Sequence, residues 1–212
     1  MGPPDEREAR IAELQAQLRA RRASYVRGPV ALVCLLGTAY LLFREMPDAS
    51  YALSASEPLT LGREGDYRLD GLRSNRYVQV HGTPTATAFW GQDRQGPFVV
   101  VGLLDTPLLV RRAPLPSETW LAGHAPPPPE QTPFAVRGRL LKDSDAPAYR
   151  EAFLRARELP GMRPLQGKLW IVLEGEHPRG DWGALGTALL LLLFGAFNAW
   201  LLLDALRRRR RV

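Results

Sequence analysis

The chain is poor in cysteine, lysine and histidine. Its 212 residues contain one Cys, two Lys and three His against 26 Arg. Cys34 lies within an uncharged apolar run, so the rest of the chain has no disulfide, no thiol nucleophile and no thiolate metal site. The excess of arginine over lysine, with abundant Ala, Leu and Pro, is typical of a GC-rich bacterial genome.

Catalytic and cofactor motifs are also missing. His81, His124 and His177 are separated by 43 and 53 residues, which is not a metal-ligand spacing. The chain has no HExxH, no glycine-rich nucleotide loop and no G-x-S-x-G elbow around a serine. A Ser/His/Asp set can be assembled from Ser117, His124 and Asp105, but no local motif supports it. The sequence therefore predicts a non-enzyme without a metal or cofactor.

The net charge of +6 is concentrated at the two ends of the chain. Residues 1–27 hold six Arg against four acids, and residues 204–212 hold five Arg against one acid. Residues 44–181 hold 17 basic and 17 acidic side chains. A nucleic-acid-binding domain needs its positive charge on the folded surface, facing phosphate. The neutral middle segment therefore argues against a nucleic-acid partner.

Two uncharged apolar runs separate the charged ends from the middle. Trp182–Leu203 has 22 residues without a charge, and Gly28–Phe43 has 16 and lengthens when residues 25–27 join it. A helix of about 20 residues crosses a hydrocarbon core of roughly 30 Å. We therefore expect two transmembrane helices. The long charged leader and the lack of a nearby small-residue cleavage site favour an uncleaved anchor over a signal peptide.

Arginines flank both runs and predict the topology. By the positive-inside rule, both termini are cytoplasmic and the middle segment is periplasmic, in the inner membrane of a bacterium. Each arginine near anionic lipid gains about 1 kcal/mol. The flanking residues are Arg21, Arg22, Arg27, Arg207, Arg208, Arg209, Arg210 and Arg211. The predicted segments are a cytoplasmic amphipathic helix (1–24), a first span (25–43), the periplasmic domain (44–181), a second span (182–203) and an Arg-rich tail (204–212).

The middle segment has the pattern of a small β domain. Short stretches rich in Val, Thr and aromatic residues, with Gly or Pro between them, predict strands over Tyr67–Leu72, Arg76–His81, Thr85–Phe89, Phe98–Leu104, Leu108–Arg111, Phe134–Leu141 and Lys168–Leu173. One helix over Ala146–Glu158 has Asp145 as its expected N-cap and Pro147 in its first turn. We expect a mostly-β, OB-like barrel or a sandwich, with this helix covering an open end or face.

Two regions are candidate partner contacts. The first is residues 113–133, which carry seven prolines and form an extended connection. The second is the second span, where the Asn198 amide needs a polar partner and small residues four apart allow two helices to approach closely. The predicted contact residues are Trp120, Pro126, Pro127, Pro128, Pro129, Gly195, Asn198 and Ala199. Alternatively, Trp120 pins a plain strand connection, and the polar and small residues only pack the two spans of one chain together.

Three stretches of the middle segment resemble Surfeit-type cytochrome c oxidase assembly proteins. They are "RYVQVHG" (76–82), "GPFVVVGLLDTPLLVRRAPLP" (96–116) and "FAVRGRLLK" (134–142), within the same order of span, β domain and span. The family's Gly-x-Trp-Gln signature is absent, and His177 and Trp182 do not have the spacing of its haem-linked pair, so no haem ligand is transferred. "YVQVHGT" also resembles GIDE-domain ubiquitin ligases, but the chain has no RING domain and therefore no ligase activity.

These patterns predict a non-catalytic, membrane-anchored accessory or assembly factor. Its periplasmic β domain would be presented to a larger membrane complex, which the resemblance implies to be respiratory. Its expected partners are membrane lipid and either that complex or a second copy bound through the spans. An alternative is haem or lipid handling in a cavity of the β domain beneath the helix, and a hydrolase built on Ser117 is a third.

Overall fold

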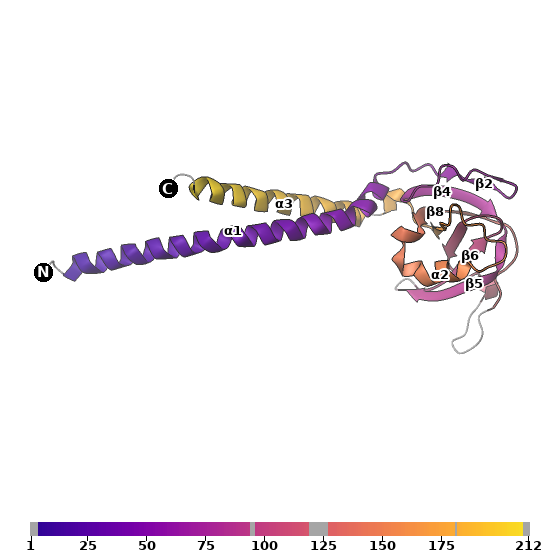
Figure 1. Ribbon diagram of the computed structural model, residues 1–212, viewed down its shortest axis with the longest axis horizontal. Coiled ribbons are helices and arrows are strands. Elements are labelled where there is room, and N and C mark those ends of the chain that lie inside the picture. The colour runs from indigo at the N-terminus through magenta and orange to yellow at the C-terminus, as the bar shows by residue number, and fades with distance from the viewer. Residues whose placement is uncertain (1–3, 94–95, 119–126, 181, 210–212) are drawn as a thin grey trace. The chain divides into compact units, whose positions relative to one another are not determined.

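The structure is a computed structural model that describes residues 4–93, 96–118, 127–180 and 182–209 (Figure 1). The chain divides into two compact units. One unit comprises Met1–Pro47 and Gly183–Val212, and the other comprises Asp48–Trp182. The first is helical and the second is mostly β. The predicted arrangement of two apolar helices around a β domain is confirmed.

Helix α1 (Pro4–Ala52) is a single helix of 49 residues. The sequence predicted a separate helix within residues 1–24 and a span ending at Phe43, but the backbone continues through both limits. A change from apolar to charged side chains does not interrupt the main-chain hydrogen bonds, and the helix continues through Pro29 and Pro47, just beyond the two predicted limits. Helix α3 (Trp182–Arg209) likewise continues past Leu203 into the arginine run.

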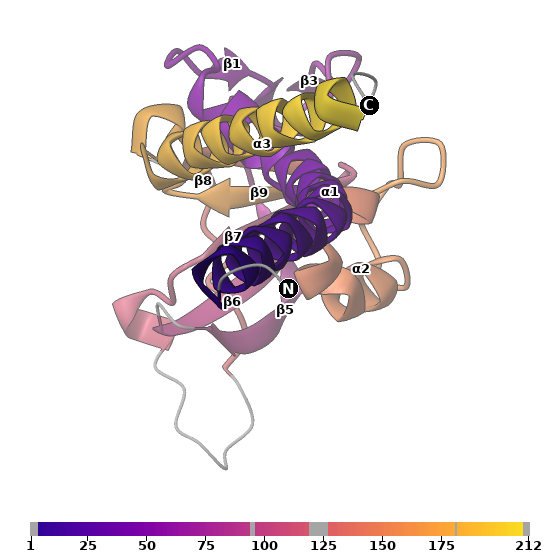
Figure 2. The same ribbon diagram turned by 90° about the vertical axis from the view of Figure 1, so that its left-hand side faces the viewer.

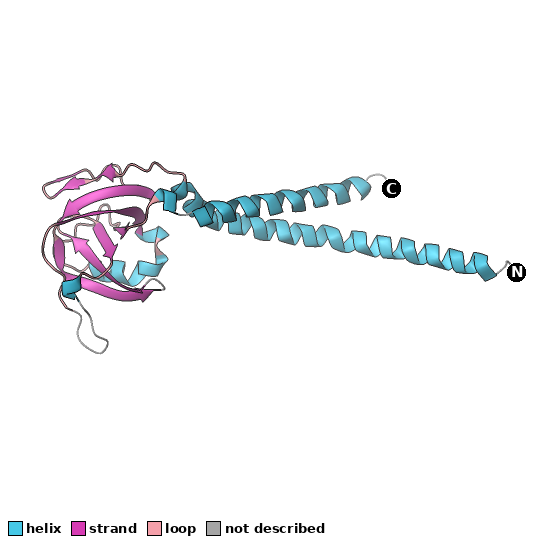
Figure 3. Ribbon diagram, turned by 180° about the vertical axis from the view of Figure 1, so that it is seen from behind, coloured by secondary structure: helices cyan, strands magenta, loops and turns pink. Residues whose placement is uncertain are grey.

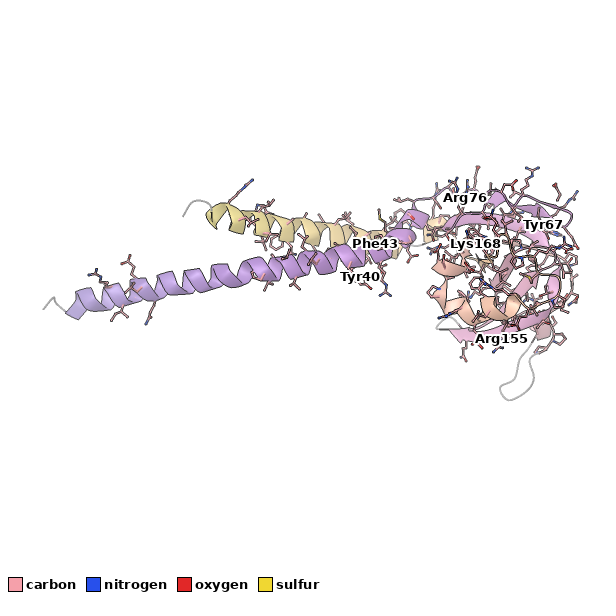
Figure 4. All side chains as sticks on the ribbon, viewed as in Figure 1. Tyr40, Phe43, Tyr67, Arg76, Arg155 and Lys168 are labelled. Carbon is pink, nitrogen blue, oxygen red and sulfur yellow. The ribbon has the colours of Figure 1, made fainter. Side chains whose placement is uncertain are left out.

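Both helices are long and apolar enough to cross a membrane. The qualifying segments are Pro29–Ala52 and Trp182–Asp204, with 24 and 23 residues. Only 11% and 6% of their most apolar windows are buried, whereas a core helix of a water-soluble protein would be mostly buried. Tyr40 and Phe43 are 65% and 79% exposed (Figure 4). The apolar side chains of these helices therefore point outward.

The β unit is built on one seven-stranded sheet in its described residues. The strands are β1 (Leu59–Thr60), β4 (Arg76–Gly82), β5 (Pro84–Asp93), β6 (Gly96–Leu103), β7 (Leu108–Arg112), β8 (Phe134–Lys142) and β9 (Trp170–Glu174). Their order is β1-β4-β8-β9-β7-β6-β5, and Figure 2 shows β8, β9, β7, β6 and β5 following one another. The pairs β1/β4 and β7/β9 are parallel and the others are antiparallel. A small hairpin of β2 (Gly62–Arg63) and β3 (Asp66–Tyr67) forms a second sheet.

Six of the seven predicted strands are present, and the prediction of a strand over Tyr67–Leu72 is wrong. Of the segment predicted as strand Tyr67–Leu72, only Tyr67 belongs to a strand. The amide of Leu72 donates to the carbonyl of Leu69, which is a turn contact, and both leucines pack against the core instead of pairing with a neighbour. Apolar residues at this spacing therefore reflected core packing rather than a strand.

The sheet is strongly curved (Figure 3). Strands β4 and β5 follow one another in the chain, yet β4 lies second from one end of the strand order and β5 lies at the other end. Strand β4 pairs with β8, the chain turns at Thr83, and β5 pairs with β6 at the other end of the strand order. The inner face is filled by buried side chains that include Val78, Leu103 and Val110. This face of the sheet therefore carries a closely packed apolar core.

The outer face of the sheet is covered by the one α-helix of the described β unit. Helix α2 (Arg150–Ala156) places Phe153 and Ala156 in a second core cluster. The helix is shorter than predicted because Asp143–Asp145 and Pro147–Tyr149 form 3-10 turns, η2 and η3. Asp145 is not an N-cap; its carboxylate accepts hydrogen bonds from the hydroxyls of Ser74 and Ser144.

Candidate interaction surfaces

The proline-rich segment is described only in part. Trp120 and Pro126 lie outside the described residues, so the predicted docking role of Trp120 stays a prediction. Beyond them, Pro127 is half-buried, Pro128 is exposed and Pro129 is buried. Of the three described prolines of this run, Pro128 is therefore the exposed one, and Pro116 and Pro133 in the stems of the segment are exposed as well.

A buried ion pair holds the two stems of this segment. Arg112 at the end of β7 donates from Nη1 and Nη2 to Glu118 Oε2 and Oε1, both at 2.6 Å, and the side chains are 4% and 2% exposed. The amide of Leu115 donates to Glu118 Oε2 at 2.9 Å and the amide of Glu130 to Oε1 at 3.0 Å. Glu118 therefore joins residues on both sides of the segment.

Glu118 is ionised despite its burial. Burial alone raises the pKa of this carboxyl, but the hydrogen bonds from Arg112, Leu115 and Glu130 outweigh it and lower the pKa to about 2. The sequence did not reveal this pair, because nothing distinguishes Arg112 and Glu118 from the many other charged residues before the fold brings them together. The hydrogen bonds of Glu118 therefore hold the two stems of the proline segment together.

A second charged cluster lies where the chain enters and leaves the β unit. Arg139 on β8 contacts Asp48 Oδ1 at 2.5 Å and Glu176 Oε2 at 3.8 Å, and its Nε donates to Asn75 Oδ1 at 2.9 Å. Its guanidinium lies 4.6 Å from the ring centroid of Tyr51. The Tyr51 hydroxyl donates to the carbonyl of Glu176 at 2.8 Å. One side chain thus ties the last turn of α1 and the segment before α3 to the sheet.

The predicted contact residues of the second span lie partly inside the helical unit. Asn198 is 6% exposed, and its Nδ2 donates to the carbonyl of Phe194 at 2.8 Å. A Cβ placed on Gly195 would lie 3.3 Å from Thr38 Cγ2, so α1 and α3 approach closely at this glycine. Gly195 and Ala199 remain half-exposed. The Asn198 amide is therefore hydrogen-bonded within its own helix, and a contact of Gly195, Asn198 and Ala199 with another chain stays a prediction.

The arginines predicted as topology anchors border the two apolar segments of the helical unit. Arg21, Arg22 and Arg27 lie within α1, and α3 includes Arg207 and extends to Arg209. Arg207 is exposed. Arg208 lies within α3, and Arg210 and Arg211 lie outside the described residues.

An aromatic groove of about 490 Å³ lies between α2 and strands β5 and β6. Its lining includes Phe89, Trp90, Phe98 and Tyr149. A Cβ on Gly91 would be 2.3 Å from Phe98 Cζ, so the Phe98 ring lies directly on this glycine. The rings of Phe98 and Tyr149 meet edge to face, with centroids 5.8 Å apart. The groove lies beside the helix on the outer face, and the sequence did not predict it.

The residues considered for catalysis have other partners. Ser117 donates to Glu130 Oε2 at 3.1 Å, and Asp105 forms an ion pair with Arg163 at 2.8 Å. His124 lies outside the described residues. Within the described ranges, no three His, Cys, Asp or Glu side chains are grouped so as to hold a metal ion. The ring of His177 packs against Tyr77, with centroids 4.9 Å apart.

Comparisons of this chain with protein families, curated proteins and solved structures gave no match. The resemblance to Surfeit-type assembly proteins therefore stays a prediction from the quoted motifs. The functional argument rests on the surfaces described above.

Proposed function

We propose that the chain is a non-catalytic, membrane-anchored accessory or assembly factor that holds its β domain at the periplasmic surface of a bacterial inner membrane. The observation that carries this proposal is the outward exposure of the apolar side chains on both helices. In water such surfaces aggregate, whereas in a bilayer they contact lipid. The arginines that border the two apolar segments support cytoplasmic termini and contact with anionic lipid.

The β domain supports a role in contact more than in chemistry. Two charged clusters, centred on Glu118 and Arg139, fix the stems of the proline segment and the two ends of the domain. Rigid presentation of a surface lowers the entropy that a partner must overcome on binding. The proline segment, with Pro128 exposed, is the surface we assign to a membrane-protein complex, of the respiratory kind implied by the resemblance.

Topology is tested first by cysteine labelling in a Cys34→Ser background. Ser144→Cys lies on an exposed residue of the β domain. A membrane-impermeant maleimide should label it in cells with an opened outer membrane, whereas Val212→Cys should react only after the inner membrane is permeabilised. The opposite pattern would contradict the proposed orientation.

The contact role is tested with a photo-crosslinking residue in place of Pro128. After illumination of native membranes and solubilisation in mild detergent, mass spectrometry should identify the same membrane protein in repeated preparations. The matched control places the crosslinker at exposed Leu154 on α2, where this product should be absent. A chain that stays uncrosslinked and runs alone at every condition would overturn the accessory role.

A second candidate function is favoured by the aromatic groove alone. Its volume of about 490 Å³ and its aromatic lining suit an apolar ligand such as part of a lipid. The groove is lined in part by the helical region, against which the sequence analysis placed its alternative ligand site. An absorption scan for a Soret band and mass spectrometry of copurifying lipid test this function, and Phe98→Ala should release any ligand that occupies the groove.

A further inference from the structure

The hairpin β2–β3 and strand β4 enclose a second, polar groove of about 430 Å³. It is lined by Thr60, Gly62, Arg63, Asp66, Arg68, Gln79 and His81. Two guanidinium groups, an imidazole, an amide and a hydroxyl thus lie around one depression, with a single carboxylate among them. The sequence analysis gave this region no role beyond a strand.

The hairpin that carries Arg63 and Asp66 has a backbone conformation that requires glycine. Gly62 has φ +94°, and a Cβ at this position would lie 2.0 Å from the carbonyl oxygen of Asp66. Gly65 at the turn has φ +84°. Only glycine adopts the conformation at Gly62 and tolerates the contact. Arg63 and Asp66 are therefore held opposite each other by a tight turn.

The hairpin is also tied to β4. The Tyr67 hydroxyl, on a residue labelled in Figure 4, donates to the carbonyl of His81 at 3.2 Å. The amide of Leu61 donates to the carbonyl of Gln79 at 2.8 Å, and the amide of Arg68 donates to the carbonyl of Leu61 at 2.9 Å. These bonds connect the backbones of the hairpin, of the residues next to it and of β4, which carry the polar side chains.

The two arginines of this groove differ from the paired arginines of the domain. Arg112, Arg139, Arg157 and Arg163 each form an ion pair with a carboxylate. In the part of the chain that the structure describes, the guanidinium groups of Arg63 and Arg68 have no hydrogen-bond or ion-pair partner.

Nearby acids do not neutralise these arginines. Glu64, next to Arg63, accepts a hydrogen bond from the Thr83 hydroxyl at 2.7 Å instead. Asp66 lines the groove but forms no ion pair with Arg63 or Arg68 among the described residues. Among the side chains that line the groove, two arginines therefore accompany one carboxylate, and no other described residue uses the guanidinium donors of either arginine.

Gln79 lines the groove and carries an amide donor as well as an acceptor. Its Oε1 accepts a hydrogen bond from Arg137 Nε at 2.8 Å, so the acceptor of this amide is already used. Thr60 and the imidazole of His81 can donate there as well.

We propose that this groove binds a phosphate group. Guanidinium groups match phosphate oxygens in geometry and charge, and the Gln79 amide, the Thr60 hydroxyl and the His81 imidazole provide the remaining donors. Asp66 opposes the anion, so its carboxylate limits the affinity. The phosphate comes either from the headgroup of a membrane lipid or from a soluble phosphate compound, and the site chemistry is the same for both.

The test uses the full chain in a maltoside detergent, which contains no phosphate. Isothermal titration calorimetry with inorganic phosphate, and separately with a short-chain phosphatidylglycerol below its micelle concentration, measures the two sources. Arg63→Ala/Arg68→Ala should weaken binding by about tenfold or more, and Asp66→Asn should tighten it several-fold. The matched control is Arg73→Ala/Arg76→Ala, which removes two exposed arginines of the same domain that do not line the groove.

Each outcome bears on the proposal. Binding of both probes at equal affinity, lost in Arg63→Ala/Arg68→Ala, supports a soluble phosphate source, and much tighter binding of the lipid supports a headgroup. No binding of either probe, or the same loss in the Arg73→Ala/Arg76→Ala control, overturns it. Circular dichroism and thermal unfolding of each variant should match the wild type, because the replaced side chains are exposed. The result does not depend on the accessory role, since no partner protein is involved.

Discussion

The helical unit and the β unit distribute apolar and polar side chains in opposite ways. In the β unit, Val78 and Val101 are fully buried and Arg63 is exposed. In the helical unit, Leu193 is 60% exposed, while Thr38 and Asn198 are each 6% exposed. A water-soluble fold buries its apolar side chains, as the β unit does, whereas a helix in a bilayer exposes them. This inversion supports the proposal that the two helices lie in a membrane and the β unit in water.

The β unit also buries one charged pair, Arg112 and Glu118, and breaking this pair should have the largest effect on the free energy of unfolding. Glu118→Ala would leave the Arg112 guanidinium buried without its carboxylate, at a cost of about 3–5 kcal/mol. Urea unfolding of the detergent-solubilised chain, followed by tryptophan fluorescence, measures this loss. The control is Glu151→Ala, which breaks the exposed pair with Arg155 and should cost about 0–1 kcal/mol. Equal effects of the two substitutions would show that burial does not set the strength of these pairs.

The inversion itself is tested by one substitution made in both units. Leu193→Lys on α3 places a charge at the middle of the second apolar segment, which should cost about 2.5–3.5 kcal/mol of insertion free energy. Leu154→Lys on α2 replaces a leucine of similar exposure, 55% against 60%, and should change stability by about 0.5 kcal/mol or less. A membrane-insertion assay measures the first and urea unfolding the second. If Leu193→Lys were as neutral as Leu154→Lys, the helices would not be solvated by lipid.

Acid should weaken the β unit through Glu118. The pKa of this carboxyl is lowered to about 2 in the folded chain from its ordinary value of 4.5. The folded state therefore gains stability from Glu118 above pH 4.5, and this contribution declines as the pH falls towards 2. Unfolding midpoints measured between these limits should fall more steeply in the wild type than in Glu118→Gln. Parallel pH profiles for the two proteins would contradict this assignment.

The smallest effect is expected at the polar centre of the helical unit. Asn198→Leu should cost less than about 1 kcal/mol, because the Asn198 amide is bonded to its own helix at Phe194 and not to α1. Disulfide crosslinking between Thr38→Cys and Gly195→Cys, with Cys34→Ser, should give the same yield with and without Asn198→Leu. A large fall in yield would mean that Asn198 holds the two helices together.

The sequence predicted most of the β unit because its central strands carry a strong local signal. The valine-rich stretch around Val100 and the apolar stretch around Val136 were placed within one or two residues of β6 and β8. Strands β1, β2 and β3 have two residues each, too few for any periodicity to appear. The continuous α1 was divided in the prediction because charge marks a change of environment and not the end of a helix.

The surfaces were harder to predict because each is assembled from distant segments. Phe89, Phe98 and Tyr149 meet in the aromatic groove from two strands and a turn, and no pattern in the sequence relates them. Glu118 and Arg112 are six residues apart, and at this spacing two side chains do not contact each other in a regular helix or strand. For Asn198, by contrast, an amide within an apolar helix was sufficient to draw attention to it.

The Arg139 cluster has a further consequence for how this domain can be handled. Asp48 and Glu176, which lie near the two ends of the β unit, contact the same guanidinium at 2.5 and 3.8 Å. A domain whose ends lie this close together can be joined end to end by a short peptide or inserted into a loop of another protein. We therefore expect that residues 48–182, joined end to end by a short peptide, would keep the contacts of Arg139 with Asp48 and Glu176.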